Sequence, residues 1–345
     1  MDKTFTDESV LDRFNFLVNA PALFNAVTTA VELKVFQFLA EHPQSEFADI
    51  QLSTGVPPHQ LRVLLQAVCS TGLLERRDGK YSNSEVAQDL LASDAEDSWG
   101  HILIGWKEIY YPAFAQMTTA LKAGTNSALA SYPGDEPTLY QRLSRNPALE
   151  AVFHRAMSAF TLRSVDALVG RAEFSTVRHL LDVGGGDGTT SAKLAARHPE
   201  LRCTVFDMPS VSKLGDDKAA VFPDRVALHP GDIFEDGFPA GADAVLFSHV
   251  LEIFDEARIL GQLKKAYDVL PAGGRIFIYG YNVSDDETTG IFGARLGLYF
   301  NVLASGQGMA YPARDYENWL RQVGFNDVET IRGMPYEHGL SMGTR

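Results

Sequence analysis

The fold is decided by one short stretch, Leu180-Leu181-Asp182-Val183-Gly184-Gly185-Gly186-Asp187-Gly188-Thr189-Thr190. An apolar run that ends at Val183 predicts a buried strand, and glycines follow at alternate positions before a helical pattern begins at Ser191. Glycine tolerates positive φ and lets a ligand approach without meeting a Cβ. The next helix would point its unpaired N–H groups at that ligand. The stretch predicts a strand, a ligand-binding loop and a helix, and a tight turn alone is the structural alternative.

A second strand narrows the class of ligand. The Gly-x-Gly-x-Gly spacing differs from the fingerprint of dinucleotide enzymes, whose third glycine would fall on Thr189. The apolar residues 203–206 predict a strand that ends in Asp207, which lies 25 residues after Asp182. A carboxylate at the tip of a neighbouring strand can accept hydrogen bonds from both hydroxyls of a ribose. The sequence therefore predicts a ligand that contains a nucleoside.

Four segments, 182–188, 206–209, 231–234 and 271–275, resemble signature segments of the S-adenosylmethionine-dependent O-methyltransferase family of plant and bacterial secondary metabolism. The resemblance covers nearly the whole chain. It implies S-adenosyl-L-methionine as cofactor, with the loop glycines at its methionine part, one acidic residue at its ribose and another at its adenine. The cofactor-binding residues expected from the loop and the resemblance are Asp182, Gly184, Gly186, Gly188, Asp207, Met208, Asp232, Ile233 and Ser248.

The alternation of strand and helix patterns predicts an α/β fold with a doubly wound sheet. The resemblance implies that this is a Rossmann-like methyltransferase sheet and that an N-terminal all-helical winged-helix dimerisation domain precedes it. Further strands are expected near 226–229, 244–247, 275–279, 328–331 and 340–342, and helices at 257–269 and 316–323. Helical segments are also expected at 99–121 and 137–169. The expected division is a dimerisation domain at 1–110, a helical linker and substrate-pocket wall at 111–170, and the cofactor-binding methyltransferase domain at 171–345.

The N-terminal region suggests a homodimer. Residues 14–41 predict a helix with apolar side chains on more than one side, which suits a second subunit or, alternatively, a buried place within one chain. Residues 45–92 predict a winged helix-turn-helix, for which a DNA-binding repressor is the rival interpretation. Its recognition helix, 59–68, has one arginine and no lysine, so it has few positive charges to contact DNA phosphates. The resemblance implies that this module serves dimerisation.

Composition excludes several classes of partner. The 345 residues carry a net charge of −14, which argues against nucleic acid and anionic membranes. The chain opens without a signal-peptide pattern and has no run approaching 18 apolar residues, so we expect neither secretion nor a membrane span. Two cysteines, far apart in sequence, favour a reducing cytoplasm. No Cys, His and carboxylate cluster has metal-ligand spacing, so no metal is expected.

The sequence departs from the family where the chemistry is expected. A hydroxyl acceptor needs a base, and the family's histidine stands in a Val-Leu-His-Asp-Trp segment that reads here Val250-Leu251-Glu252-Ile253-Phe254. The carboxylate that orients this histidine falls on or near Gly280. Three interpretations follow: Glu252 is the base, with its pKa raised by apolar neighbours; the nucleophile carries no proton, as in a thioether or an activated carbon; or the cofactor is bound without methyl transfer. A structural carboxylate is the alternative, and among the functional interpretations the sequence favours the second.

A methylthio-carboxylic acid suits that second interpretation, and O-methylation of a phenolic or hydroxylated metabolite with Glu252 as base is the alternative. The acceptor's carboxylate would need a cation, for which Arg295 and then Arg155 are candidates. Tyrosine hydroxyls or rings could contact the acceptor, although core packing explains them as well. His249, beside Ser248, could bond the cofactor or the substrate. The predicted catalytic residues are Glu252 and His249, and the predicted substrate-binding residues are Tyr111, Phe153, Met157, Arg295 and Tyr299.

Overall fold

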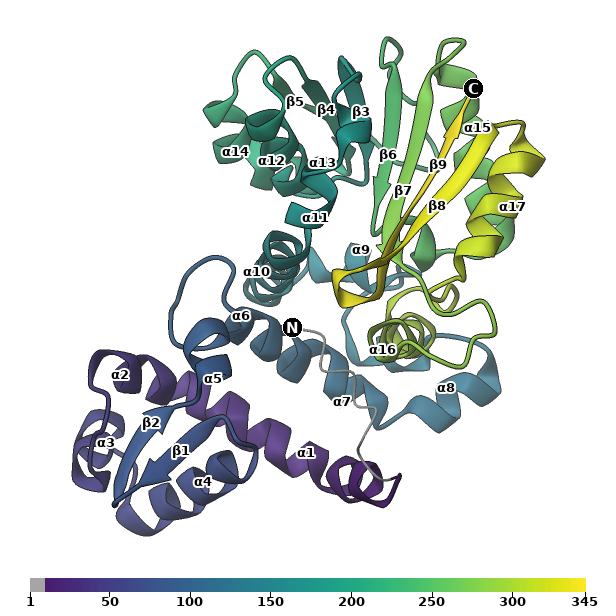
Figure 1. The fold of residues 1–345 in the computed structure, drawn as a ribbon. Helices are drawn as coiled ribbons and strands as arrows, with labels where there is room; N and C mark the ends of the chain where they lie inside the picture. The colour runs from purple at the N-terminus through teal and green to yellow at the C-terminus, as the bar shows by residue number, and fades with distance from the viewer. Residues whose placement is uncertain (1–9) are drawn as a thin grey trace. The chain divides into compact units, whose positions relative to one another are not determined.

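The computed structural model describes residues 10–345, which divide into two compact units between Glu108 and Ile109 (Figure 1). The sequence predicts a boundary at 110 and a separate helical linker at 111–170. In the structure, residues 111–170 belong to the same unit as the sheet, and Val165, Leu168 and Val169 at their end pack into its core.

The first unit is a winged helix with a wing made of two short strands. Its helices enclose a core in which Leu61, Leu65 and Val68, spaced on one face of α4, are fully buried. The strands pair antiparallel across Asp78 and Gly79, both of positive φ, as a two-residue hairpin requires. This wing confirms the winged helix-turn-helix expected over 45–92. The elements are α1 Val10–Glu32, α2 Val35–Glu41, α3 Phe47–Thr54, α4 Pro58–Ser70, β1 Leu74–Arg77, β2 Lys80–Asn83, α5 Glu85–Leu90 and α6 Trp99–Gly105.

Helix α1 has two different halves. The single helix expected over 14–41 is wrong, because Lys34 takes a left-handed conformation with φ 58° and separates α1 from α2. Val27 and Ala30 are buried, whereas Phe14 and Leu17 are 57% and 69% exposed. Among residues 10–345, α1 is the one helix long and apolar enough to cross a bilayer by length and composition alone, a property that core helices and N-terminal signal sequences share. Its first half therefore presents an apolar face that this unit does not cover.

The second unit begins with short helices where two long ones were expected. Helix α6 runs into a π-helical turn, Trp106–Tyr110, and Pro112 lacks the N–H that would continue a regular helix. Gly124, with φ 64°, ends the next helix. The elements before the sheet are α7 Tyr111–Phe114, α8 Met117–Ala123, α9 Leu139–Leu143, α10 Pro147–Ser164 and α11 Asp166–Val169.

The described residues of this unit form a seven-stranded sheet in the order β5-β4-β3-β6-β7-β9-β8. All neighbours pair in parallel except β9, which runs antiparallel to β7 and β8. The expected strands and helices are confirmed, most of them a few residues longer than predicted. They are β3 His179–Val183, α12 Thr189–Arg197, β4 Arg202–Asp207, α13 Pro209–Ser212, α14 Asp216–Val221, β5 Val226–Pro230, β6 Ala244–Ser248, α15 Glu256–Val269, β7 Arg275–Tyr281, α16 Ile291–Tyr299, α17 Ala313–Val323, β8 Asn326–Met334 and β9 His338–Thr344.

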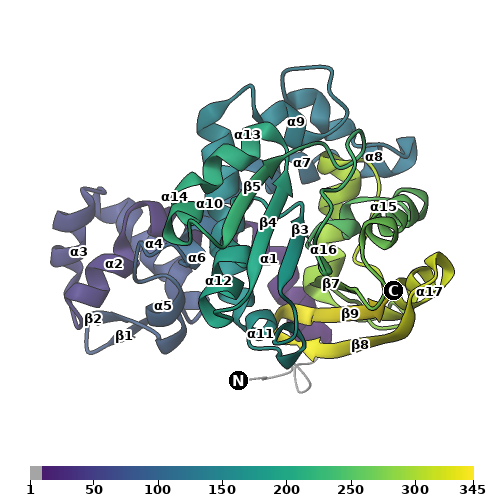
Figure 2. The ribbon, with the colours of Figure 1, turned by 90° about the horizontal axis from the view of Figure 1, so that it is seen from above.

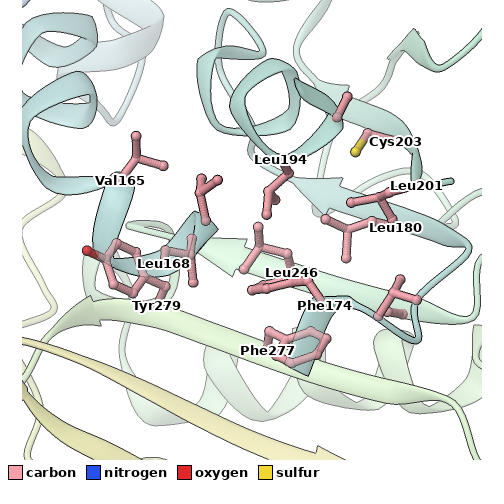
Figure 3. Packing of buried hydrophobic residues seen from close by; sticks show 14 of the residues in the cluster. Val165, Leu168, Phe174, Leu180, Leu194, Leu201, Cys203, Leu246, Phe277 and Tyr279 are labelled. Atoms are coloured by element: carbon pink, nitrogen blue, oxygen red, sulfur yellow. The ribbon is translucent and has the colours of Figure 1, made fainter. Parts of the chain in front are cut away.

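Helices cover both faces of the sheet, α12 and α14 on one side and α15 and α17 on the other (Figure 2). Successive side chains of a strand point to opposite faces, so Leu180 packs in one core cluster and Leu181 in the other. In the first cluster the rings of Phe174 and Phe277 stack at 4.5 Å, and the Tyr279 hydroxyl donates to Ser164 O at 2.9 Å (Figure 3). The strand order reverses between β3 and β6, and ligands of such sheets bind beyond the carboxyl ends of the strands at that point.

Candidate active site

The loop after β3 needs its glycines for conformation and for space. Gly184, Gly186 and Gly188 have φ of 69°, 62° and 75°, a region that other residues rarely adopt. A Cβ on Gly184 would lie 2.6 Å from Val250 Cγ2, whereas a Cβ on Gly186 would meet nothing within 4 Å. The loop is therefore packed against the end of β6 at its first glycine and open at its second.

Asp182 lies beneath this loop and is fully buried. Its Oδ2 accepts a hydrogen bond from Ser191 Oγ at 2.7 Å, while Oδ1 has no hydrogen-bond partner. Burial raises the pKa of this carboxyl to about 6, although the Ser191 bond opposes the rise. A buried acceptor without a partner, next to an open glycine loop, fits a ligand that brings a donor or a positive charge.

Asp207 joins the loop to the end of β4. Its two carboxylate oxygens accept from Gly186 N at 2.8 Å and from Met208 N at 2.7 Å. Burial raises the pKa of Asp207, and the two backbone bonds oppose that rise. Each oxygen keeps a further lone pair, so the carboxylate can also accept from two hydroxyls.

The predicted adenine residues follow β5 and lie beside Asp207. Gly231 N donates to Asp207 O at 2.9 Å, which fixes the turn next to the end of β4. Asp232 Oδ1 accepts from Phe234 N at 2.7 Å, and Ile233 packs against the second core cluster while its carbonyl accepts from Lys265 Nζ at 2.8 Å. Ser248 ends β6, next to β3. The predicted cofactor residues therefore lie together at the carboxyl ends of the neighbouring strands β5, β4, β3 and β6.

Sequence reasoning missed the role of Asp187, the polar residue among the loop glycines. Ser158 Oγ of α10 donates to Asp187 Oδ2 at 2.7 Å, and Lys218 Nζ of α14 is bonded to the same oxygen. Burial opposes ionisation, but the bonds from Lys218, Thr189 and Ser158 lower the pKa of Asp187. The loop is therefore tied to α10, the helix that carries Phe153 and Met157.

Glu252 and Gly280, the two departures from the family pattern, are in contact in the structure. Glu252 is 1% exposed, and its carboxylate occupies the space beside Gly280, where a Cβ would lie 2.8 Å from Oε2. Its Oε1 lies 3.1 Å from His249 Nδ1. His249 has a φ of 58°, which is rare for a residue with a side chain, and its Nε2 is buried without a hydrogen-bond partner. The site therefore contains an imidazole paired with a carboxylate, which the sequence pattern did not reveal.

The turn that carries Glu252 is contacted by residues 305–311, which follow α16 in the chain. Ser305 Oγ donates to Ile253 O at 2.9 Å, and the Tyr311 hydroxyl donates to Phe254 O at 2.8 Å. A Cβ on Gly308 would lie 2.3 Å from Glu252 O, so this loop approaches as closely as glycine allows. These contacts fix the backbone of the turn from which the Glu252 side chain projects.

Several predicted substrate residues form a buried aromatic cluster. The rings of Tyr110 and Tyr299 stack at 3.9 Å, and Arg295 Cζ lies 5.7 Å from the Tyr110 centroid. Burial raises the pKa of Tyr110 to about 12, and the Arg295 charge opposes the rise. The Tyr110 hydroxyl lies 3.8 Å from Met157 Sδ.

The remaining candidates differ in position. Phe153 is buried against Tyr140, with ring centroids 5.8 Å apart. Burial raises the pKa of Tyr111, and the Arg295 charge opposes that rise. Arg155 is exposed on α10, so it is a poor candidate for a buried carboxylate site. Within residues 10–345, no group of three His, Cys, Asp or Glu is arranged to hold a metal ion.

Two family models match the chain. The sequence model of the O-methyltransferase domain matches residues 114–326, and that of the O-methyltransferase dimerisation domain matches residues 17–93. The chain belongs to the O-methyltransferase family. Like other O-methyltransferase family members, it is an S-adenosylmethionine-dependent enzyme with a Rossmann-like methyltransferase fold and a dimerisation domain, which confirms the predicted fold class, enzyme class and cofactor.

Two relatives of this O-methyltransferase family member differ in the atom that they methylate. L-tyrosine C(3)-methyltransferase of Streptomyces lavendulae is 31% identical over 93% of this chain and 89% of its own length. 3-Hydroxy-5-methyl-1-naphthoate 3-O-methyltransferase of Streptomyces sahachiroi is 30% identical over 92% and 91%. Family membership therefore establishes methyl transfer to a small molecule and leaves the acceptor atom open.

Solved structures agree with the fold of the family. The S-adenosylmethionine-dependent methyltransferase SibL, in its apo form, superimposes with a TM-score of 0.83 at 31% identity over 97% of this chain and 99% of its own. Human N-acetylserotonin methyltransferase in complex with S-adenosylmethionine gives 0.86 at 22% identity over 99% of both chains, which supports the fold alone.

Proposed function

We propose that this enzyme methylates a small phenolic acid, on its oxygen or on the adjacent ring carbon, with His249 as the proton acceptor and Glu252 as the residue that positions it. The observation that carries the proposal is the 3.1 Å contact between His249 Nδ1 and the buried Glu252 carboxylate.

The cofactor residues keep the roles expected from the sequence. Asp182 and the open side of Gly186 would face the methionine part, Asp207 the ribose hydroxyls, and Asp232 with Ile233 the adenine. Met208 and Ser248 would complete the rim. The buried, unpartnered Oδ1 of Asp182 supports the place of the methionine part. When bound, S-adenosyl-L-methionine supplies an electrophilic methyl group.

The imidazole–carboxylate pair supports proton removal. When the Glu252 carboxylate is ionised, it accepts from His249 Nδ1–H, and Nε2 is left as a bare acceptor. A phenol must lose its proton to become a strong oxygen nucleophile, and the same ionisation activates its ortho carbon. Glu252 is buried behind the histidine, so it positions the ring and stabilises its protonated form. This geometry favours a phenolic acceptor over the thioether that the sequence pattern favoured, since a thioether needs no base.

An acidic acceptor is supported by charge. Arg295 lies on α16 against Tyr110, and its charge opposes the rise in pKa of Tyr110, Tyr111 and Tyr281. We propose that Arg295 binds the acceptor's carboxylate, with Phe153, Met157, Tyr111 and Tyr299 around its ring. The two relatives, by their names, act on an amino acid and a naphthoate, each a phenol with a carboxylate.

An acceptor screen tests the nucleophile. Release of S-adenosylhomocysteine is measured with phenolic acids, 3-methylthiopropionate and an enolic acid. The proposal expects turnover with at least one phenolic acid and none with the thioether; turnover restricted to the thioether would restore S-methylation. For any phenolic acid that is turned over, His249→Asn should lower kcat by about 100-fold, in the range of a lost general base, and Glu252→Gln by less. His59→Asn, on α4 of the first unit, is the control.

A binding measurement tests the ribose assignment independently. Asp207→Ala should weaken S-adenosylhomocysteine by about tenfold or more in calorimetry, because two hydroxyls lose a shared charged acceptor. An unchanged affinity would remove that assignment.

We further propose that the protein is a cytoplasmic homodimer that pairs through the exposed apolar half of α1, which the matched dimerisation domain includes from residue 17. The absence of nucleic-acid and membrane partners stays a prediction from the charge. A gel shift against sheared DNA at physiological salt tests the repressor alternative.

A further inference from the structure

We propose that His338 is a specificity-determining residue, whose Nε2 accepts a hydrogen bond from a second donor on the methyl acceptor, next to the donor taken by His249. The acceptor class is then narrower than a phenol. It is an arene with two neighbouring donors, an ortho-dihydroxy or ortho-aminohydroxy acid. This inference rests on the proposed function and deepens it.

His338 is placed by a strained turn. It is the first residue of β9, 1% exposed, and pairs in register with Tyr281 of β7. Tyr336 and Glu337, just before it, have φ of 59° and 63°, which costs energy for residues with side chains.

The neighbouring helix holds this turn. The Glu337 carboxylate accepts from Ile291 N at 2.7 Å and from Gly293 N at 3.1 Å, two of the free N–H groups that begin α16. The same helix carries Arg295. The turn that positions His338 is therefore locked to the helix that carries the proposed carboxylate-binding residue.

The tautomer of the His338 ring follows from the hydrogen bond of its Nδ1. Nδ1 lies 2.7 Å from Pro335 O, and a carbonyl can only accept, so Nδ1 carries the proton and Nε2 is bare. Burial and, to a smaller extent, the nearby His249 lower the pKa of His338 to about 2, although the bond to Pro335 O opposes the fall, so the ring is neutral at working pH. Its Nε2 is buried and has no hydrogen-bond partner. Buried polar groups are nearly always hydrogen-bonded, so this nitrogen is a candidate acceptor for a donor on a ligand.

The rings of His249 and His338 are neighbours. The ring centroids of His249 and His338 are 4.7 Å apart, and both rings contact Tyr279 and Tyr281. The ring of Phe160, on α10, meets both imidazoles edge to face, with centroids 6.4 and 6.0 Å away. Two bare imidazole nitrogens in one aromatic cluster fit a flat ligand that presents two donors from adjacent atoms. A single donor would leave one nitrogen unsatisfied.

The test compares acceptors that differ by one hydroxyl. Methylation of 3,4-dihydroxybenzoate, 3-hydroxybenzoate and 4-hydroxybenzoate is followed by S-adenosylhomocysteine release, and binding of each acid to the S-adenosylhomocysteine complex is measured by calorimetry. The wild type should prefer the dihydroxy acid by about tenfold or more in kcat/KM, or in affinity where turnover is absent. His338→Phe, which keeps a ring and removes the acceptor, should reduce this preference to about twofold.

Two controls separate specificity from packing. His338→Gln, whose amide oxygen can accept from a similar direction, should recover part of the preference, and S-adenosylhomocysteine affinity should stay unchanged in both variants. A wild type that binds all three acids equally, or an unchanged preference in His338→Phe or a complete loss of it in His338→Gln, would overturn the inference. Failure of the proposed function looks different, because His249→Asn would then retain full activity on a phenolic acid while the acceptor preference is unaffected.

Discussion

Asp182→Asn should stabilise the cofactor-free protein, by an amount that grows as the pH rises. The Asp182 carboxyl is fully buried, and burial raises its pKa from 3.8 to about 6. The fold therefore favours the neutral acid. With respect to this group, the wild type is fully stable below pH 3.8 and loses stability as the pH rises through 6. Asparagine has the same shape and never ionises, so the variant escapes this loss.

The size of the effect follows from the shift. A shift of about 2 pKa units means that ionisation of Asp182 lowers the free energy of unfolding of the wild type by about 3 kcal/mol at pH 8. At pH 5 about half of this loss is already present. The difference in free energy of unfolding between variant and wild type should therefore grow by about 1 to 2 kcal/mol from pH 5 to pH 8.

Urea unfolding at the two pH values measures this difference. Trp319 lies in the core of the second unit, so its fluorescence reports that unit in a chain where Trp99 and Trp106 are replaced by phenylalanine. Ser191→Ala removes the donor that stabilises the carboxylate, so it should steepen the loss of stability with pH. Asp182→Asn should also weaken S-adenosylhomocysteine binding. A stability difference that is the same at pH 5 and pH 8 would refute the reasoning.

Three further changes test other contacts. Gly280→Ala places a Cβ 2.8 Å from the Glu252 carboxylate and should lower kcat by about tenfold or more with S-adenosylhomocysteine affinity unchanged; equal kcat would show that the position of Glu252 does not matter. Ser158→Ala removes the bond from α10 to Asp187 and should raise the acceptor KM several-fold, about 1 kcal/mol, while a change confined to cofactor binding would contradict this coupling. Leu17→Asp puts a charge on the exposed apolar half of α1 and should convert a dimer to a monomer in sedimentation velocity; an unchanged mass would exclude that face.

The sequence alone predicted the scaffold and the cofactor edge. Apolar runs, glycine positions and helix periods report local backbone preference and burial, and these placed β3, β4 and the loop after Val183 where the structure has them. The predicted helix boundaries were wrong where an apolar helical pattern fits either one long helix or two shorter ones. A left-handed Lys34 divides the first helix, and a π-helical turn before Pro112 interrupts the next region, since an apolar helical period continues across both.

The reactive pairs were decided by tertiary structure. Glu252 and Gly280 look like two losses in the sequence, but β6 and β7 are neighbours in the sheet, so the small residue on one strand makes room for the carboxylate that follows the other. His338 lies 89 residues after His249 in the chain, and only the antiparallel pairing of β9 with β7 brings the two rings together. Local sequence fixes what each residue can do, whereas strand order and register fix which residues can do it together, because side-chain contacts depend on through-space neighbours that no local pattern encodes.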